Sequence, residues 1–521
     1  MKTFLLTAIK KATLLARLQV ENPQHDLDFF LEKNHNFDRR KFLKNATVLG
    51  ASILAYPIFN QNTEGVSLLK NLPRIAIVGG GISGLSAGYY LQKKGIKATI
   101  YEADKRVGGR IKSNQIFGDK SLTTEIGAEF IDTQHEDIIQ LAKDLELWNN
   151  KIDVTEDTLG VKETFFMRGQ HYSMDDLVKE LSQVTKKLKE DSDSTGDIYE
   201  TAYAKILDNQ SFSEYLDRLP LSLWVKDLLT AAFLGEQGLD PEQMSSLNLI
   251  DTLDIKNSTV ELFGASDERY KIKGGNQQIP EGLAAKLSEQ ILKEHRLLAI
   301  KEKADNTLQL TFESNGKTIE ATYDVVILAI PLTILRGLDW YMDLPPLTSK
   351  IIKELSYGAN TKCVMEFEGR TWRTANYQGY FFNEFIHNGW DSTHMQTDNR
   401  GVGTFTVFLG GETAKQATKG SENNLRDLYL PVLEKAFQGS TDAFTGKMEL
   451  ANWSKNPFIK ASYSSRSVGQ FSQFTHKIGL PVRNLYFAGE HCSHDHWGFM
   501  NGAAETGRLA AEQIIEKILK K

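Results

Sequence analysis

The clearest hydrophobic pattern in the chain begins at Ile75. Ile75–Val78 is a short run of mostly β-branched residues, whose length and composition are typical of a buried parallel strand. A glycine-rich turn follows, then a helix-like stretch from Ile82, then a second apolar run that ends at Glu102. The pattern therefore predicts a strand, a turn, a helix and a second strand in succession, as at the start of a nucleotide-binding domain.

Longer-range patterns suggest how the rest of the chain is organised. The stretch from about residue 137 to 250 is helical in pattern, and in Met174–Glu190 the apolar positions recur at intervals of three and four. In Thr307–Phe312 and in Cys363–Phe367 apolar and polar residues alternate, as they do in half-exposed strands. Glu190–Asp197 is polar and predicts a loop-like break.

The glycine turn carries a nucleotide-binding motif. Gly79, Gly81 and Gly84 stand in G-x-G-x-x-G register, which allows a tight turn, close approach to a pyrophosphate and close helix packing. Amides at the helix start supply an anion site, and Glu102 stands where a carboxylate accepts hydrogen bonds from ribose hydroxyls. Such turns also arise for steric reasons alone, but the whole unit favours FAD or NAD. The candidate cofactor contacts here are Gly79, Gly81, Ile82, Ser83, Gly84, Glu102 and Ala103.

The next segment separates FAD from NAD. Arg106-Val107-Gly108-Gly109-Arg110 resembles the R-x-G-G-R signature of the flavin-containing amine oxidase superfamily, of the monoamine oxidase and L-amino-acid oxidase type. The glycines let the backbone pass a pyrophosphate, and Arg110 can donate a planar fork of hydrogen bonds to it. Both arginines could instead be surface charges on a turn. The resemblance implies FAD, with Arg106, Gly109 and Arg110 among its contacts.

The resemblance covers nearly the whole chain from about residue 72. Glu125–Phe130 is similar to the segment that runs along the flavin ring in these oxidases, Asp324–Pro331 matches another family segment, and the strand expected at Arg296–Ile300 resembles one that touches adenine. Asn484–His491 and Trp497–Ala503 resemble the closing FAD motif, whose helix directs its amino end at the flavin. The contacts implied are Gly127, Ala128, Glu129, Phe130, Leu297, Gly489, Glu490, Gly498, Phe499, Met500 and Ala503.

The resemblance also implies an architecture. We expect an α/β fold with a Rossmann-like FAD-binding domain assembled from discontinuous segments, a mixed-sheet substrate domain and a helical insertion. The expected boundaries are a signal and linker at 1–65, FAD-binding segments at 70–145, 266–332 and 453–521, a helical or substrate region at 146–265 and the substrate-domain sheet at 333–452.

The family's chemistry points to four catalytic candidates. In these enzymes the flavin accepts a hydride from the carbon that bears an amine, the imine hydrolyses, and oxygen reoxidises the flavin to give hydrogen peroxide. Lys362 matches the lysine that in many members holds a water against the reactive ring nitrogen, although a lysine in a turn before a strand is more often exposed and inert. Tyr463 and Phe499 match rings that flank the substrate amine, and Trp453 matches a ring beside the flavin. Taken singly, each is more often a core residue, and only its spacing from the family motifs favours the site.

Two departures narrow the resemblance. Ser462 stands where animal monoamine oxidases carry the cysteine that binds flavin covalently, so noncovalent FAD is expected. Phe130 stands where venom-type L-amino-acid oxidases carry an arginine for the substrate carboxylate, which Arg373 or another arginine could replace. Glu129 could face a cationic substrate or bind backbone amides.

Several functions stay open at this stage. The expected substrate is a primary amine or an L-amino acid. The alternatives are a decarboxylating enzyme of the tryptophan 2-monooxygenase type, a polyamine oxidase and a flavin-binding protein without turnover.

Composition and charge mainly exclude other classes. The chain has 521 residues, of which 25% are charged, and a formal net charge of −6, so nothing indicates a nucleic-acid partner. Cys363 and Cys492 are its only cysteines, too few for a disulfide framework and without the spacing of a metal site. Whether the protein forms a homodimer is left open.

The N-terminal region has the pattern of a targeting segment. Asp38–Lys44 contains Arg39-Arg40, precedes the uncharged run Ala46–Phe59 and resembles a twin-arginine export signal. The run is shorter than the roughly 20 residues that cross a bilayer and contains Pro57, although a retained membrane anchor stays open. The pattern predicts export by the twin-arginine translocase, after folding around the cofactor, to the periplasm or the cell exterior.

Overall fold

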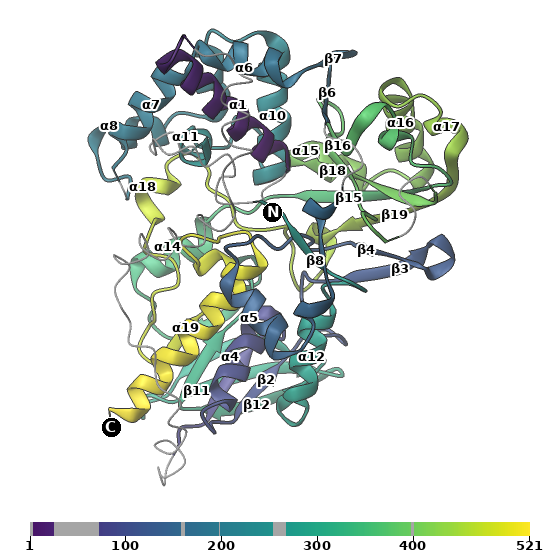
Figure 1. The fold of residues 1–521 in the computed structure, drawn as a ribbon. Helices are drawn as coiled ribbons and strands as arrows, with labels where there is room; N and C mark the ends of the chain where they lie inside the picture. Colours follow the sequence, from purple (N-terminus) through teal and green to yellow (C-terminus); the bar gives the residue numbers. More distant parts are fainter. Residues whose placement is uncertain are drawn as a thin grey trace.

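The computed structural model describes residues 4–24, 72–157, 162–196, 198–253, 267–396 and 401–520. Figure 1 shows a nucleotide-binding region, a helical region and a region built on a large sheet. The twin-arginine segment and the apolar run after it lie outside the described residues, so the export signal and its translocase stay predictions. Within the described ranges, no helix is both long and apolar enough to cross a membrane.

The nucleotide-binding region is centred on a five-stranded parallel sheet with the order β20-β13-β1-β2-β9. Val78 pairs with Leu328, which in turn pairs with Phe487, so the sheet joins the early, middle and late parts of the chain. The strand predicted at Ile75–Val78 is confirmed. The strands are β1 (Ile75–Val78), β2 (Ala98–Tyr101), β9 (Ile291–Leu292), β13 (Val325–Leu328) and β20 (Leu485–Phe487).

Two different layers cover the faces of this sheet. Ile75 and Ile77 pack on the helices α4 (Ile82–Gln92), α5 (Glu136–Asp144), α12 (Gln278–Lys286) and α19 (Met500–Leu519). Ala76 and Val78 pack on a second sheet, whose order is β12-β11-β10-β14. Its strands are β10 (Arg296–Glu302), β11 (Leu308–Ser314), β12 (Lys317–Tyr323) and β14 (Asp339–Tyr341).

The third region is built on a seven-stranded sheet with the order β19-β15-β18-β17-β16-β6-β7. Its register sorts side chains between two faces. Lys362 is opposite Phe408, which is opposite Asn388, so these three share one face. Cys363 and Val407 are on the other face, in a core with the helix α16 (Glu422–Ala436). The strands are β6 (Lys162–Met167), β7 (Gln170–Tyr172), β15 (Asn360–Phe367), β16 (Tyr377–Asn383), β17 (His387–Asp391), β18 (Gly403–Gly410) and β19 (Phe444–Asn452).

Shorter elements connect these regions. β5 (Lys151–Asp153) pairs antiparallel with β8 (Tyr270–Ile272), and β3 (Ser113–Phe117) forms a hairpin with β4 (Leu122–Glu125). The remaining helices outside the helical region are α13 (Leu332–Leu335), α14 (Pro346–Glu354), α15 (Gly411–Ala417), α17 (Ser440–Ala443) and α18 (Gln470–Phe474).

The helical region has an unexpected member. It contains α6 (Met174–Ser182), α7 (Thr185–Ser194), α8 (Ala202–Asp208), α9 (Phe212–Arg218), α10 (Leu223–Gln237) and α11 (Leu247–Leu253). Packed against α6, α7, α10 and α11 is α1 (Phe4–Glu21), which buries Ile9, Ala12 and Leu15 in the same core. Residues 1–65 were expected to form a signal and linker, but the part described here is an integral helix of the fold, because its spacing of small and apolar residues fits this core.

The structure also corrects several local predictions. The helical pattern at Met174–Glu190 corresponds to two helices, α6 and α7. The loop-like break predicted from Glu190 is partly helical, because α7 continues to Ser194 with a charged exposed face. The region predicted to be helical contains β6, which extends the large sheet through its pairing with β16. Lys362 is inside β15 and not in a turn before it. The segment 332–355 packs in the core of the nucleotide-binding region. The substrate-domain sheet therefore begins later in the chain than the expected residue 333.

The packing of α1 can be tested by truncating one side chain on each of its faces. Leu15 is 1% exposed and Val20 is 52% exposed. We expect Leu15→Ala to lower the free energy of unfolding by about 3 kcal/mol, because a buried leucine leaves a cavity. Val20→Ala should change it by less than about 0.5 kcal/mol. Urea unfolding of both variants measures the difference, and equal stabilities would show that α1 is not docked.

Candidate functional site

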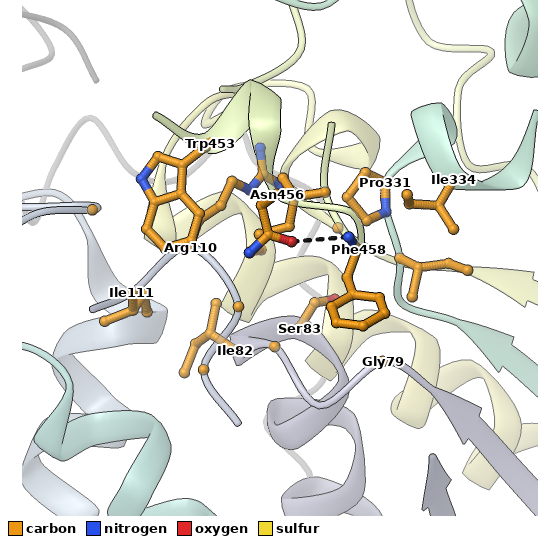
Figure 2. Close-up of a pocket in the computed structure, with 18 of the residues that line it drawn as sticks. Gly79, Ile82, Ser83, Arg110, Ile111, Pro331, Ile334, Trp453, Asn456 and Phe458 are labelled. Carbon is orange, nitrogen blue, oxygen red and sulfur yellow. Dashed lines mark hydrogen bonds between the residues drawn. The ribbon is translucent and has the colours of Figure 1, made fainter. Parts of the chain in front are cut away.

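A single long cavity contains almost every residue singled out from the sequence. It extends from Glu102 and Leu297 at one end, past the glycine turn, to Lys362, Tyr463 and Phe499 at the other. Figure 2 shows Gly79, Ser83, Pro331 and Phe458 among the residues that line it, with the ring of Phe458 next to Ser83. Of the candidate catalytic and cofactor-binding residues, all line this cavity except Gly84.

The glycine turn has the shape that its motif predicts. Gly79 has φ +111°, and a Cβ there would lie 2.4 Å from the carbonyl oxygen of Ala329. A Cβ on Gly84 would lie 1.9 Å from the carbonyl oxygen of Gly79, so Gly84 serves helix packing behind the cavity. A Cβ on Gly81 would meet nothing within 4 Å, so the open side of the turn is at Gly81. The amino end of α4 also has no side-chain cap, which leaves its amides for an anion.

Glu102 holds the turn as well as facing the cavity. Its Oε2 accepts a hydrogen bond from the amide of Gly80 at 2.7 Å, and its Oε1 accepts one from the amide of Asp104 at 2.7 Å. Burial raises the pKa of this carboxyl, and the two amides partly offset that effect. Each oxygen keeps a lone pair for a further donor such as a ribose hydroxyl.

The two arginines of the signature are occupied by protein acceptors. Arg106 donates to the carbonyl oxygens of Val107, Gly109 and Ile111 and so closes its own loop. Arg110 donates to the carbonyl oxygen of Ser462 and, at 3.0 Å, to Oε1 of Glu490. Both bonds come from Nη1 and join the loop to the C-terminal motif, while Arg110 also lines the cavity, so its contact with a pyrophosphate stays a prediction.

Glu490 connects three distant segments through one carboxylate. Oε1 accepts from Arg110 and from the amide of Ser464 at 3.1 Å. Oε2 accepts from the hydroxyl of Ser464 at 2.8 Å and from the amide of Gly498 at 3.0 Å. Burial opposes ionisation, but Arg110 and the other donors outweigh it and lower the pKa of Glu490 to about 2. The carboxylate is thus ionised and fully used in holding the site together.

Lys362 is buried at the flavin-segment end of the cavity and donates three hydrogen bonds. Its Nζ is 2.8 Å from the carbonyl oxygen of Glu125, 2.9 Å from that of Gly127 and 2.6 Å from Oε2 of Glu129. The side chain of Glu129 also accepts from Lys271 and Trp390. Neither suggestion for Glu129, a cationic substrate or backbone amides, matches these partners.

Aromatic rings form the walls beside Lys362. Tyr463 donates from Oη to the carbonyl oxygen of Gly235 at 2.6 Å, which fixes its ring, and burial raises the pKa of this phenol. Phe499 packs edge-on against His135, with ring centroids 4.8 Å apart. Trp453 donates from Nε1 to the carbonyl oxygen of Ile126 at 3.1 Å and so holds the segment 125–130. Figure 2 shows the indole of Trp453 near Arg110.

Two residues of this end were missed from the sequence. Phe408 lines the cavity because it is the cross-strand partner of Lys362. Lys271 reaches Glu129 from β8, a strand of three residues that carries no motif. The alternation of β18 could have placed Phe408 on a face, but only the pairing of β15 with β18 puts it beside Lys362.

The residues present fit FAD. The open side of the turn at Gly81 leaves room for a pyrophosphate, and Glu102 stands at the ribose end with lone pairs available. The adenine end is lined by Leu297 and Leu298 of the strand β10, and by His295, the residue just before that strand. A cavity lined both by the nucleotide-binding turn and by an aromatic-walled chamber suits an extended dinucleotide.

Comparison with known proteins identifies the family. A family model described as flavin containing amine oxidoreductase matches residues 82–515. The chain belongs to this family. The flavin-containing amine oxidoreductase described here is 24% identical to amine oxidase [flavin-containing] A of Sus scrofa over 473 residues, which cover 86% of this chain and 85% of that one. It is 25% identical to amine oxidase [flavin-containing] B of Homo sapiens over 489 residues, which cover 87% and 88%.

Solved structures share the fold. Cyclohexylamine oxidase from Brevibacterium oxydans has a TM-score of 0.74 at 21% identity, covering 86% of this chain and all of that one. Wild-type putrescine oxidase bound to putrescine has a TM-score of 0.72 at 19% identity, covering 85% and 99%. The resemblance to the superfamily, the enzyme class and FAD as cofactor are thereby confirmed.

The hydrogen bonds and the ion pair of Glu490 predict that the folded protein loses stability in acid. The folded-state pKa of about 2 lies below the ordinary 4.5, so the stability from this group is complete above about pH 4.5 and is lost as the pH falls through 2. The shift corresponds to about 3 kcal/mol at neutral pH. We expect the difference in free energy of unfolding between the wild type and Glu490→Gln to shrink steadily over this pH window in urea titrations.

A surface glutamate provides the control. The Glu289 side chain is 86% exposed, and Glu289→Gln should leave the free energy of unfolding nearly unchanged at every pH. A difference between the wild type and Glu490→Gln that does not depend on pH would contradict the ionised crosslink.

Proposed function

We propose that this protein is an oxidase of primary amines that produces a carbonyl compound, ammonia and hydrogen peroxide. The observation that carries the proposal is the end of the cavity beside Lys362, where Phe130, Phe408, Tyr463 and Phe499 provide aromatic and apolar walls. FAD supplies the acceptor for a hydride from the carbon next to nitrogen, and oxygen takes the electrons onward. The walls bind and orient the amine, and exclude water from it.

The apolar chamber also favours the reactive form of the substrate. An alkylammonium ion loses hydration when it enters such a chamber, so burial lowers its pKa and favours the neutral amine. The lone pair of the neutral amine assists departure of the hydride. The aromatic rings of Tyr463 and Phe499 can contact the nitrogen without supplying a competing hydrogen-bond acceptor.

The arginines favour an amine over an amino acid. Arg106, Arg110 and Arg296 are the arginines along the cavity within the described ranges, and each is held by carbonyl oxygens or by a glutamate. Arg373, the alternative suggested by the sequence, binds Asp157 and Asp391. Each of these arginines already has a protein acceptor, which supports an amine without a carboxylate.

The proposal is tested by a panel of substrates. Purified yellow protein should release hydrogen peroxide with primary monoamines at least about tenfold faster than with the L-amino acids of the same side chains, a difference of about 1.4 kcal/mol. Coupled peroxidase assays measure the rates, and mass spectrometry identifies the products. Amide products would instead support the decarboxylating monooxygenase, and no peroxide with any amine would contradict an oxidase.

We also propose that FAD is bound noncovalently. Cys363 is on the face of the large sheet opposite Lys362, and neither it nor Cys492 lines the cavity, while Ser462 does. The nearest thiol is therefore not positioned to form a thioether with the ring. Acid precipitation of the purified protein should leave the yellow colour in the supernatant, and a yellow pellet would contradict the proposal.

A further inference from the structure

Three buried charges meet beside the flavin-segment end of the cavity. The carboxylate of Glu129 is at the centre, with Oε2 2.6 Å from Nζ of Lys362 and Oε1 3.0 Å from Nζ of Lys271. Nε1 of Trp390 donates a further hydrogen bond to Oε1 at 3.1 Å. Glu129 is 1% exposed and both lysines are 3% exposed. We call Lys362, Glu129 and Lys271 the charge triad.

The triad is held rigidly by its surroundings. Lys362 uses its three N–H groups on Glu129 and on the carbonyl oxygens of Glu125 and Gly127. Lys271 donates also to the carbonyl oxygen of Ser392 at 2.9 Å and lies 5.2 Å from the ring centroid of Phe130. These three acceptors match the three N–H groups of an ammonium, so the position of the charge is fixed.

The triad carries an unbalanced charge. Two ammonium groups and one carboxylate leave one net positive charge on three side chains that are at most 3% exposed. Burial alone would raise the pKa of Glu129, but Lys362 and Lys271 outweigh it, so the pKa of Glu129 lies below its ordinary value and the carboxylate stays ionised. A charge buried in a medium of low dielectric acts over longer distances than one at the surface.

We propose that Lys271 is a positioning residue that acts through Glu129 and Lys362 to fix the charge beside the isoalloxazine ring, and thereby raises the reduction potential of the bound flavin. The proposal deepens the function above and rests on its FAD. Glu129 and Lys362 line the cavity together with Gly127 and Phe130, whereas Lys271 is behind them. A net positive charge there stabilises the negative charge that the ring gains on reduction.

Counting charges gives an experiment whose outcomes have opposite signs. Lys271→Met leaves one ammonium and one carboxylate, a net charge of zero, so the midpoint potential should fall. Glu129→Gln leaves two ammonium groups, so the potential should rise. The double variant returns to one net positive charge and should return toward the wild-type potential. Each single shift should change the equilibrium constant with a reference dye by about tenfold.

The measurement avoids any dependence on the substrate. Each holoenzyme is reduced anaerobically in equilibrium with dyes of known potential, so the result stands even if the amine proves to be of another class. All variants are compared over a series of pH values, because burial raises the pKa of the neighbouring Glu125 to about 7 and both Glu129 and Lys271 act on that carboxyl. Failure of the proposed function would appear only in the peroxide assay.

Two controls separate charge from structure. Lys271→Arg keeps the charge and should keep the potential near that of the wild type. Lys93→Met removes an ammonium that pairs with Asp144 at the surface, 3.2 Å away, and should leave the potential unchanged. The proposal would be overturned if Lys271→Met and Glu129→Gln shifted the midpoint potential in the same direction, or if neither substitution changed it.

Discussion

The site depends on the buried carboxylate of Glu490. It receives hydrogen bonds from the loop after the second strand, from the segment around Ser464 and from the turn before α19. These segments come from different parts of the chain and contribute different walls of one cavity. Because the carboxylate has four donors and is only 3% exposed, the cost of burying its charge is offset only while all three segments stay in place.

A second buried carboxylate on the cavity wall, Glu129, has a different charge balance. Glu490 is matched with one arginine, whereas Glu129 is matched with two lysines. The first arrangement is neutral and serves to hold segments together. The second leaves a positive charge, which a purely structural crosslink would not need. The difference suggests that charge itself is the useful property beside Lys362.

Much of the nucleotide-binding region could be predicted because its determinants are local. A short apolar strand, a glycine turn and an acid at the end of the next strand are each specified by a few neighbouring residues, and Glu102, Gly79 and Gly81 are where the motif implies. Lys362 was identified by its match to the family, but the sequence predicted neither its burial nor its hydrogen-bond partners. Lys271 and Phe408 could not be found, because their positions depend on how strands distant in sequence pair with one another. The role of α1 was missed because its core is assembled almost entirely from residues beyond 170.

The docking of α1 has a consequence for the order in which the chain folds. The residues that bury Ile9, Ala12 and Leu15 include Leu177, Val225 and Ile250, so the contacts of α1 are among the most distant in sequence within the helical region. This helix is synthesised before the helices it packs on, so its apolar face lacks its main partner until residues 174–182 of α6 have followed. The contacts of α1 are therefore complete only after the later helices of this region, up to α11, have been made.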